Sequence, residues 1–328
     1  MIKIAIYDTH RFEKNYLLTA FQKFQVTFLD VRLNMQTAKL ATGCQAVVLF
    51  VHDQADRATL QALKESGVRF IALRSAGFNH VDLSAARDLN MRVARVPEYS
   101  PYSVAEHTLA LILALNRKIY RAYNRVRDLN FSLDGLVGFD IHGKTVGVVG
   151  TGRIGSQVVR ILKGFGCHIL ATDPNPNSEL SKEITYTNLG DLCARSDIIT
   201  LHAPLSDATK HLIDAEMIRL MKFGVMLINT SRGGLLKTKD VIGALKSGQI
   251  GYLGLDVYEE EDALFFEDHS EEILQDDIIA RLLTFPNVLI TSHQAFLTEN
   301  ALSRIAETTA KNLECFEKNK ECPNEIFS

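Results

Sequence analysis

The sequence predicts an α/β protein made of two doubly wound parallel-sheet domains. The chain of 328 residues exceeds the size at which a single hydrophobic core usually stops growing, so two domains are expected. Short runs rich in Val, Ile and Leu alternate with helical patterns twice along the chain, and the pattern restarts after "VPEYSP" at 96–101. Such alternation is typical of parallel sheets covered by their crossover helices.

The first hundred residues carry the smaller of the two patterns. Residues 58–66 have the periodicity of a short helix, and Gly67 stands where a helix would stop. The expected strands are the apolar runs at 2–8, 26–30, 46–50, 70–74 and 91–96. A small doubly wound unit is therefore predicted here.

A long helix is expected to open the second domain. Ser100 suits the N-cap, Pro101 suits the first helical position, and apolar residues recur at helical spacing as far as Leu115. The basic continuation of this helix at 116–128 could be a nucleic-acid patch. We favour a solvated or subunit-facing helix side, because a net charge of −3 provides no wider basic surface.

Six further apolar runs predict the sheet of the second domain. Their continuous apolar character indicates strands that helices cover on both faces. They lie at 144–150, 168–173, 197–202, 225–231, 252–257 and 287–292. A helical segment from about Thr298 to Asn319 closes the chain.

The stretch "VGVVGTGRIGSQ" carries three glycines between a predicted strand and a predicted helix. Gly150 would allow a tight turn, Gly152 would let the backbone approach a pyrophosphate, and Gly155 would let the helix pack close to the strand. Asp173 ends the following strand, where a carboxylate accepts from a ribose 2′-hydroxyl and repels a 2′-phosphate. Alternatively, Asp173 initiates a turn before Pro174. The pattern predicts a Rossmann domain that prefers NAD to NADP.

An arginine, Arg232, follows the apolar strand in "VMLINTSRGGLL" at 225–236. A guanidinium at a strand end is most often a surface ion-pair partner. In a parallel sheet, however, the carboxyl ends of the strands line the ligand crevice, and a cleft between the two domains is expected to hold the reaction. The anion is then a cofactor phosphate or a substrate carboxylate.

A domain that binds NAD implies hydride transfer, which needs a proton donor beside the carbonyl oxygen of a ketone. Histidine exchanges protons near neutral pH. His202 and His293 stand at strand ends, and His293 in "LITSHQAF" is better placed because its strand leads toward the last crossover. A carboxylate should orient it. The acidic segment "LDVYEEEDALFFED" offers four: Asp256, Glu259, Glu260 and Glu261.

Composition narrows the remaining classes of function. Five cysteines without a C-x-x-C pair argue against a disulfide framework and a zinc site. The start "MIKIAIYDTH" lacks the features of a signal peptide, and no apolar run approaches the roughly 18 residues that span a bilayer. We expect a cytoplasmic protein without a metal, and neither nucleic acid nor membrane as a partner.

Several blocks fall in order along essentially the whole chain: "SAGFNHVDL", "VPEYSPYSVAEH", "GKTVGVVGTGRIG", "GFGCHILATDP", "INTSRGGLL", "LGLDVYEEE", "FFED" and "HQAFLTENAL". In this order they resemble the D-2-hydroxyacid dehydrogenase family, and more narrowly the fermentative NAD-dependent D-lactate dehydrogenases of bacteria. The resemblance implies reversible hydride transfer between NADH and pyruvate, or another small 2-keto acid.

By position, the family's catalytic Arg, Glu and His fall on Arg232, Glu261 and His293. The resemblance implies that Arg232 holds the substrate carboxylate bidentately, that His293 protonates the carbonyl oxygen, and that Glu261 keeps the imidazole charged. Other substrate contacts are implied for the N–H groups of Ala76 and Gly77 and for the side chain of Tyr99.

The resemblance also implies cofactor contacts beyond the three glycines and Asp173. They lie at the helix start after the glycines and at the later strand ends: Arg153, Ile154, His202, Ala203, Pro204, Thr209, Thr230, Ser231 and Asp256. Thr209 departs from the family's pattern, in which many members have Asn.

The family further implies that the first domain is split. A flavodoxin-like substrate domain of residues 1–100 would be completed by residues 298–328, and residues 101–297 would form the NAD-binding domain. Related enzymes are dimers or tetramers joined largely through that domain. A homodimer or homotetramer is therefore expected, with the helix at 101–115 as a contact.

One alternative belongs to another class, because the same family contains proteins that sense NAD and bind partners without turnover. The complete set of Arg232, Glu261 and His293 favours an enzyme, since a sensor has no physical need of all three. Formate oxidation is disfavoured because that branch pairs its His with Gln. A regulatory serine-pathway enzyme is disfavoured because no effector domain follows.

Overall fold

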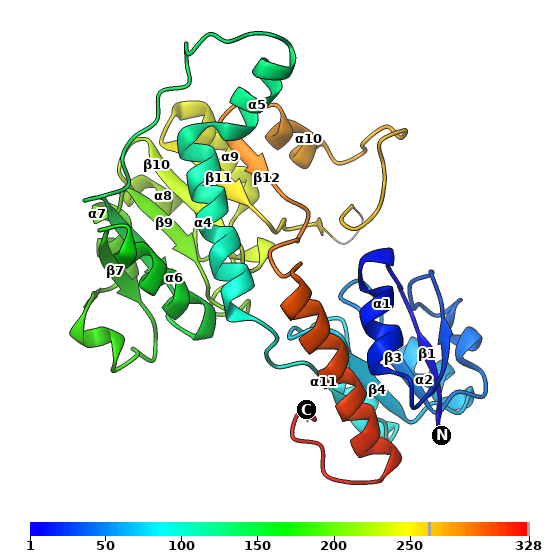
Figure 1. The fold of residues 1–328 in the computed structure, drawn as a ribbon. Coiled ribbons are helices and arrows are strands. Elements are labelled where there is room, and N and C mark those ends of the chain that lie inside the picture. Colours follow the sequence, from blue (N-terminus) through cyan, green and yellow to red (C-terminus); the bar gives the residue numbers. More distant parts are fainter. Residues whose placement is uncertain (262–263, 327–328) are drawn as a thin grey trace. The chain divides into compact units, whose positions relative to one another are not determined.

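The computed structural model describes residues 1–261 and 264–326, which form two compact units (Figure 1). The first unit comprises residues 1–100 and 297–326, and the second comprises residues 101–296. Leu297 groups with the first unit, whereas the bounds implied by the family resemblance place it in the second. Both units are α/β and each has its own parallel sheet.

The sheet of the first unit has five parallel strands in the order β2-β1-β3-β4-β5. Their bounds are β1 (Lys3–Ile6), β2 (Gln25–Phe28), β3 (Ala46–Leu49), β4 (Phe70–Leu73) and β5 (Arg92–Ala94). Each coincides with one of the predicted apolar runs. The order reverses between β1 and β3, as in a doubly wound sheet, so this part of the predicted fold class is confirmed.

Helices cover both faces of this sheet. One face packs against α1 (Arg11–Ala20) and α11 (Glu299–Glu317). The other packs against the 3₁₀ turn η1 (Ala38–Ala41), α2 (Arg57–Glu65) and α3 (Leu83–Asp88). Ile4 and Ile6 of β1 lie in the same apolar cluster as Leu313 of α11. Ala5, between them, lies in the cluster that contains Leu60 of α2, because successive strand residues point to opposite faces.

The sheet of the second unit has seven parallel strands in the order β12-β11-β10-β9-β6-β7-β8. Their bounds are β6 (Thr145–Val149), β7 (His168–Thr172), β8 (Thr185–Tyr186), β9 (Ile198–Leu201), β10 (Val225–Asn229), β11 (Ile250–Leu255) and β12 (Val288–Ile290). Six match the predicted runs. β8 was not predicted, because its two residues form no apolar pattern.

Two layers of helices enclose this sheet. One face packs against α4 (Pro101–Arg117) and α6 (Arg153–Gly164), with the 3₁₀ turn η2 (Leu180–Lys182) beside them. The other packs against α7 (Leu189–Arg195), α8 (Ala215–Leu220), α9 (Thr238–Ser247), α10 (Asp277–Leu283) and the 3₁₀ turn η3 (Gly233–Leu235). The strand order reverses between β6 and β9. In a sheet of this kind, ligands bind at the carboxyl ends of the strands beside that reversal.

The predicted continuation of the long helix beyond residue 116 is interrupted. Lys118 adopts a left-handed backbone conformation (φ 50°) that ends α4 and starts a separate helix, α5 (Ile119–Arg127). α5 has no buried residue. Figure 1 shows it extending from the end of α4, away from the sheet that α4 covers.

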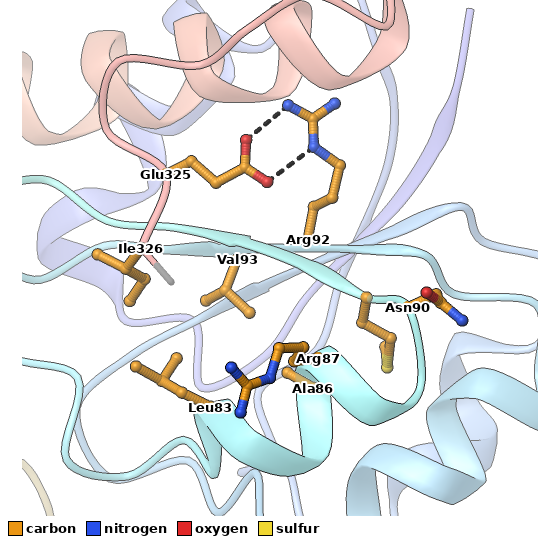
Figure 2. Close-up of a pocket in the computed structure, with 9 residues that line it drawn as sticks. Leu83, Ala86, Arg87, Asn90, Arg92, Val93, Glu325 and Ile326 are labelled. Atoms are coloured by element: carbon orange, nitrogen blue, oxygen red, sulfur yellow. Dashed lines mark hydrogen bonds and ion pairs between the residues drawn. The ribbon is translucent and has the colours of Figure 1, made fainter. Parts of the chain in front are cut away.

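The last described residues form a strap on the edge strand β5. Glu325 makes an antiparallel bridge with Ala94, and the Ile326 N–H donates to the Val93 carbonyl at 2.9 Å. Figure 2 shows the carboxylate of Glu325 facing the guanidinium of Arg92, which donates to it at 2.8 and 2.6 Å. The strap and α3 line a pocket of about 270 Å³ that contains none of the predicted site residues.

Candidate active site

The glycine-rich turn lies at the carboxyl end of β6. Gly150 has φ +91°, and a Cβ there would lie 2.8 Å from the carbonyl carbon and oxygen of His202. A Cβ at Gly155 would collide with the carbonyl oxygen of Gly150. Gly152 has open space around its Cα and is exposed. The turn therefore needs glycine at 150 and 155 for its own packing, and at 152 it leaves room for a ligand to approach the backbone.

Helix α6 starts directly after this turn. Gly152 is its N-cap, and no side chain caps the first turn, which begins with Arg153 and Ile154. The N–H groups at an uncapped helix start lack intrahelical acceptors, and the helix dipole places a partial positive charge there. This arrangement suits the pyrophosphate of a dinucleotide.

Asp173 follows β7 and faces the same turn. Its Oδ2 accepts from the Thr151 N–H at 2.6 Å and from the Thr151 hydroxyl at 3.1 Å. Its Oδ1 accepts from the Asn175 N–H at 2.8 Å, which is the turn-forming bond of the alternative reading. The carboxylate thus lies beside the glycine-rich turn, in a position to accept from the ribose of a dinucleotide bound there. It also closes the turn that contains Pro174.

The loop after β9 carries the predicted residues 202–209. Desolvation lowers the pKa of His202 to about 3, so this ring is neutral at neutral pH, and its Nε2 lies 2.9 Å from the Thr200 hydroxyl. The Thr209 hydroxyl donates to the Pro204 carbonyl at 2.6 Å and closes its own loop. Ser231 donates to the Ala203 carbonyl at 2.6 Å, which joins this loop to the next strand end. A neutral His202 is unsuited to be the proton donor.

Arg232 lies after β10 and is the N-cap of η3. Asn229, fully buried, accepts from the Ser231 N–H at 3.0 Å and donates to the Arg232 carbonyl at 2.8 Å, which fixes the backbone that presents the guanidinium. Within the described residues, no carboxylate lies within ion-pair distance of Arg232, and Nη1 donates only to the Ser231 carbonyl at 2.7 Å. The ordinary explanation, a surface ion pair, therefore lacks its acid, and the guanidinium can bind an anion.

His293 and Glu261 form a pair. The Nδ1 atom of His293 lies 2.7 Å from Oε1 of Glu261, and the two side chains are 19% and 14% exposed. Glu261 Oε2 accepts from the Tyr258 N–H at 2.8 Å, and the ring of Phe266 lies 6.0 Å from the imidazole. A carboxylate on Nδ1 keeps a proton there and leaves Nε2 to act on a substrate.

The other acids of the segment have different partners. Glu259 binds Nε2 of His211 at 2.6 Å and the Thr238 hydroxyl at 2.8 Å; burial raises its pKa, but these hydrogen bonds outweigh burial and leave it lowered. Glu260 is exposed. Asp256 is fully buried, and its Oδ1 and Oδ2 accept from the N–H groups of Gln294 and Ala295, both at 2.9 Å. Of the four acids, Glu261 is the one bonded to the His293 ring.

In the first unit, the loop after β4 presents Ala76 and Gly77. Their carbonyl groups are held, by Arg95 Nη1 at 2.8 Å and by the Ser75 hydroxyl at 2.7 Å. Their N–H groups have no acceptor among the residues that the structure describes. Two fixed N–H groups without acceptors suit a carboxylate. Tyr99 lies near the end of the same unit.

Sequence reasoning missed three residues that hold the strand ends in place. Asn229 orients the loop of Arg232, as described above. Thr108 of α4, fully buried, lies 2.8 Å from the hydroxyl of Thr230. His107 lies 3.1 Å from the hydroxyl of Thr291. For His107 and Thr108 the available signal was a polar pair directly before the apolar run 109–115 of the same helix. For Asn229 it was a polar residue at the end of an apolar strand.

No helix among the described residues is long and apolar enough to cross a membrane. No group of three or more His, Cys, Asp or Glu side chains within residues 1–261 and 264–326 could hold a metal ion.

Comparison with known proteins adds three kinds of finding. The family model described as the NAD-binding domain of D-isomer specific 2-hydroxyacid dehydrogenases matches residues 109–295. The D-lactate dehydrogenase of Escherichia coli (strain K12) is 50% identical over 328 residues, covering 99% of this chain and 100% of that protein.

Solved structures agree with this. The pyruvate reductase of Chlamydomonas reinhardtii has a TM-score of 0.94 at 48% identity, covering 99% of this chain and 98% of the other. The D-lactate dehydrogenase of Aquifex aeolicus, solved in complex with NAD and lactic acid, has a TM-score of 0.88 at 32% identity, covering 99% of each chain.

Proposed function

Because the chain belongs to the family of D-isomer-specific 2-hydroxyacid dehydrogenases, we propose that it reduces pyruvate to D-lactate with NADH and catalyses the reverse oxidation. The chain is an NAD-dependent enzyme of this family. The observation that carries the proposal is the His293–Glu261 pair, present together with an Arg232 guanidinium that has no acid partner among the described residues.

The residues divide the chemistry among them. Bound NADH supplies the hydride that reduces the keto carbon. His293 donates a proton from Nε2 to the carbonyl oxygen, while Glu261 accepts from Nδ1 and stabilises the charged ring. Arg232 binds the substrate carboxylate through two parallel N–H donors. In this proposal the N–H groups of Ala76 and Gly77 contact the same carboxylate.

Pyruvate is proposed because similar proteins are named as a D-lactate dehydrogenase and a pyruvate reductase. The test is NADH oxidation with a panel of 2-keto acids, followed by chiral analysis of the product. D-lactate from pyruvate, with the highest kcat/KM of the panel, is expected. A higher kcat/KM for a larger 2-keto acid would replace pyruvate as the proposed substrate. L-lactate as the product would refute the proposed stereochemistry, and the absence of turnover with every acid of the panel would favour the NAD-sensing alternative.

Glu261→Gln is expected to lower kcat in both directions by about 10- to 100-fold, the value of a hydrogen bond to a charged group. Pyruvate reduction consumes the imidazolium of His293, and lactate oxidation forms it. The substitution keeps a hydrogen-bond acceptor on Nδ1 but removes the negative charge that stabilises this imidazolium.

The measurement is kcat for pyruvate reduction and for lactate oxidation at one pH, with Glu260→Gln as the matched control because Glu260 is exposed. An unchanged kcat in Glu261→Gln would mean that its charge does not act on the catalytic ring.

Asp173→Ser combined with Asn175→Arg is expected to exchange cofactor preference. The wild type should prefer NADH, because a carboxylate repels a 2′-phosphate. The double variant should lose about tenfold or more in NADH affinity, the value of a hydrogen bond to a charged group, and should gain NADPH. Kd values for both cofactors measure this, with Asp134→Ser as a charge control. Equal use of the two cofactors by the wild type would show that Asp173 does not face the ribose.

We also propose that the enzyme is cytoplasmic and a homodimer or homotetramer. The five cysteines are free, which suits a reducing compartment. The apolar side of α4, expected as a contact, packs instead inside its own unit. The segment that follows α4 carries a run of large apolar side chains that are each between 51% and 80% exposed: Ile119, Tyr123, Val126, Leu129, Phe131, Leu133 and Val137.

This segment is therefore the proposed contact between copies, because exposed apolar patches of this kind mark interaction surfaces. Val126→Glu with Leu129→Glu should lower the mass measured by sedimentation. Ile273→Glu, at a residue 85% exposed elsewhere, should leave the mass unchanged. A monomeric wild type would contradict the proposal.

A further inference from the structure

Helix α4 carries a histidine that reaches the buried ends of two strands of the second unit. Nε2 of His107 lies 3.1 Å from the Thr291 hydroxyl, just after β12, and 3.3 Å from Oδ1 of Asp256, just after β11. The His107 side chain is 17% exposed and that of Asp256 is 1% exposed. Neither the cofactor contacts nor the proton transfer proposed above use His107.

The hydrogen bonds assign the donor. The Thr291 hydroxyl donates to Oδ1 of Asp256 at 2.6 Å, so its single proton is already used. A carboxylate only accepts. His107 must therefore carry a proton on Nε2 and donate it to the Thr291 hydroxyl oxygen or to Asp256, and this requirement selects the tautomer of its ring.

Asp256 in turn holds the loop that carries His293. Its carboxylate accepts from the N–H groups of Gln294 and Ala295, and its carbonyl accepts from the His293 N–H at 2.7 Å. His293 has φ 52°, a left-handed conformation that non-glycine residues rarely adopt. Such a conformation persists when the surrounding bonds determine it. The three bonds to Asp256 meet this condition.

Few groups compensate the negative charge of the buried Asp256 carboxylate. In the part of the chain that the structure describes, His107 is the one basic side chain within 4.0 Å of Asp256. A buried charge that loses a donor is left partly unsatisfied. Without His107, Thr291 and Asp256 would hold the loop through a weaker set of bonds.

We propose that His107 is a positioning residue, which donates from Nε2 to the Thr291–Asp256 pair and thereby holds the His293 loop in its left-handed conformation. The effect on catalysis rests on the proposed function, whereas the effect on the loop does not. His107 does not touch the reacting atoms in this proposal, and its influence passes through Asp256 and Thr291.

The test uses three variants of the full chain. His107→Phe fills the site without a donor, and His107→Gln places an amide N–H at a similar reach. Glu106→Gln changes the exposed neighbour on the same helix and serves as the control. His107→Phe should lower kcat for pyruvate reduction by about 10- to 100-fold, the range for a hydrogen bond to a buried charge. His107→Gln should recover most of that loss, and Glu106→Gln should match the wild type.

A second readout needs no turnover. The backbone N–H groups of Gln294 and Ala295 donate to the carboxylate of Asp256. Their hydrogen exchange should become at least tenfold faster in His107→Phe and stay unchanged in Glu106→Gln. If His107→Phe does not fold, Thr291→Val interrupts the same chain of bonds from the other side and should show the same faster exchange. A cycle of His107→Gln with Thr291→Val should be non-additive.

Unchanged exchange and unchanged kcat in His107→Phe would overturn the inference. Equal losses in His107→Phe and His107→Gln would also overturn it, because they would assign the role to ring packing. A wild type that reduces no 2-keto acid would refute the proposed function, while faster exchange in His107→Phe would still support the effect on the loop.

Discussion

Arg232→Gln is expected to lower kcat/KM for pyruvate by about 30- to 5,000-fold while the Kd for NADH stays within about twofold of the wild type. Truncating one partner of a desolvated charge pair costs about 2–5 kcal/mol, which corresponds to that range. Glutamine cannot offer two parallel N–H donors to a carboxylate. The loss should appear mainly as a rise in KM, because the carboxylate is bound in the ground state as well as in the transition state.

Two controls make this result specific. Arg219→Gln removes an arginine of the same unit that is 74% exposed, and should change neither constant. Arg232→Lys keeps the charge without the planar fork and should recover only part of the activity. A loss of NADH affinity comparable to the loss for pyruvate would assign Arg232 to a cofactor phosphate and refute the carboxylate proposal.

His293→Asn is expected to lower kcat in both directions by about 10²- to 10⁴-fold, the usual contribution of a general acid or base. Asparagine tolerates the left-handed backbone at this position better than most residues, so the change removes the proton donor without adding strain. NADH should bind as before. Stopped-flow rates of NADH oxidation, with the NADH Kd from fluorescence, separate the two effects.

The matched control is His168→Gln, at the exposed first residue of β7, which should be silent. If His293→Asn kept more than a tenth of the wild-type kcat at neutral pH, another group would have to supply the proton. His202 is a poor substitute, because burial lowers its pKa to about 3.

The strands were predictable because burial on both faces makes them continuously apolar. The runs around Val47, Val148 and Leu227 are each fully buried, and the pattern located them without any tertiary information. The short strand β8 and the break at Lys118 carry no such signal. Lys118 donates from Nζ to the carbonyl of Val137, 19 residues away, at 2.6 Å, and helical periodicity does not register such a contact.

The site was predictable to a different extent. The spacing of the glycines predicts the shape of the turn from local sequence alone, because a Cβ at Gly155 would have no room. The partner of His293 was not decided by the residues alone, because four acids stand close together in the sequence. Glu259 is bonded to His211, 48 residues away, and only the fold reveals that bond. The role of His107 is likewise tertiary, because His107 lies on α4 and reaches residues that follow β11 and β12. The bonds of Asn229 are local, to Ser231 and Arg232 in the loop that follows its own strand.

The assembly of the first unit from both ends of the chain has a consequence for biosynthesis. Residues 101–296 are contiguous, so the larger unit has all of its core once they have left the ribosome. The face of the smaller sheet around Ile4 and Ile6 is covered by α11, whose Leu313 and Phe316 are made after the whole of the larger unit. Until then that face lacks its partner helix, although its strands are made before the larger unit. The smaller unit can therefore complete its core only after α11 has been made. Until then the N-terminal part of the nascent chain exposes apolar surface of the kind that chaperones bind.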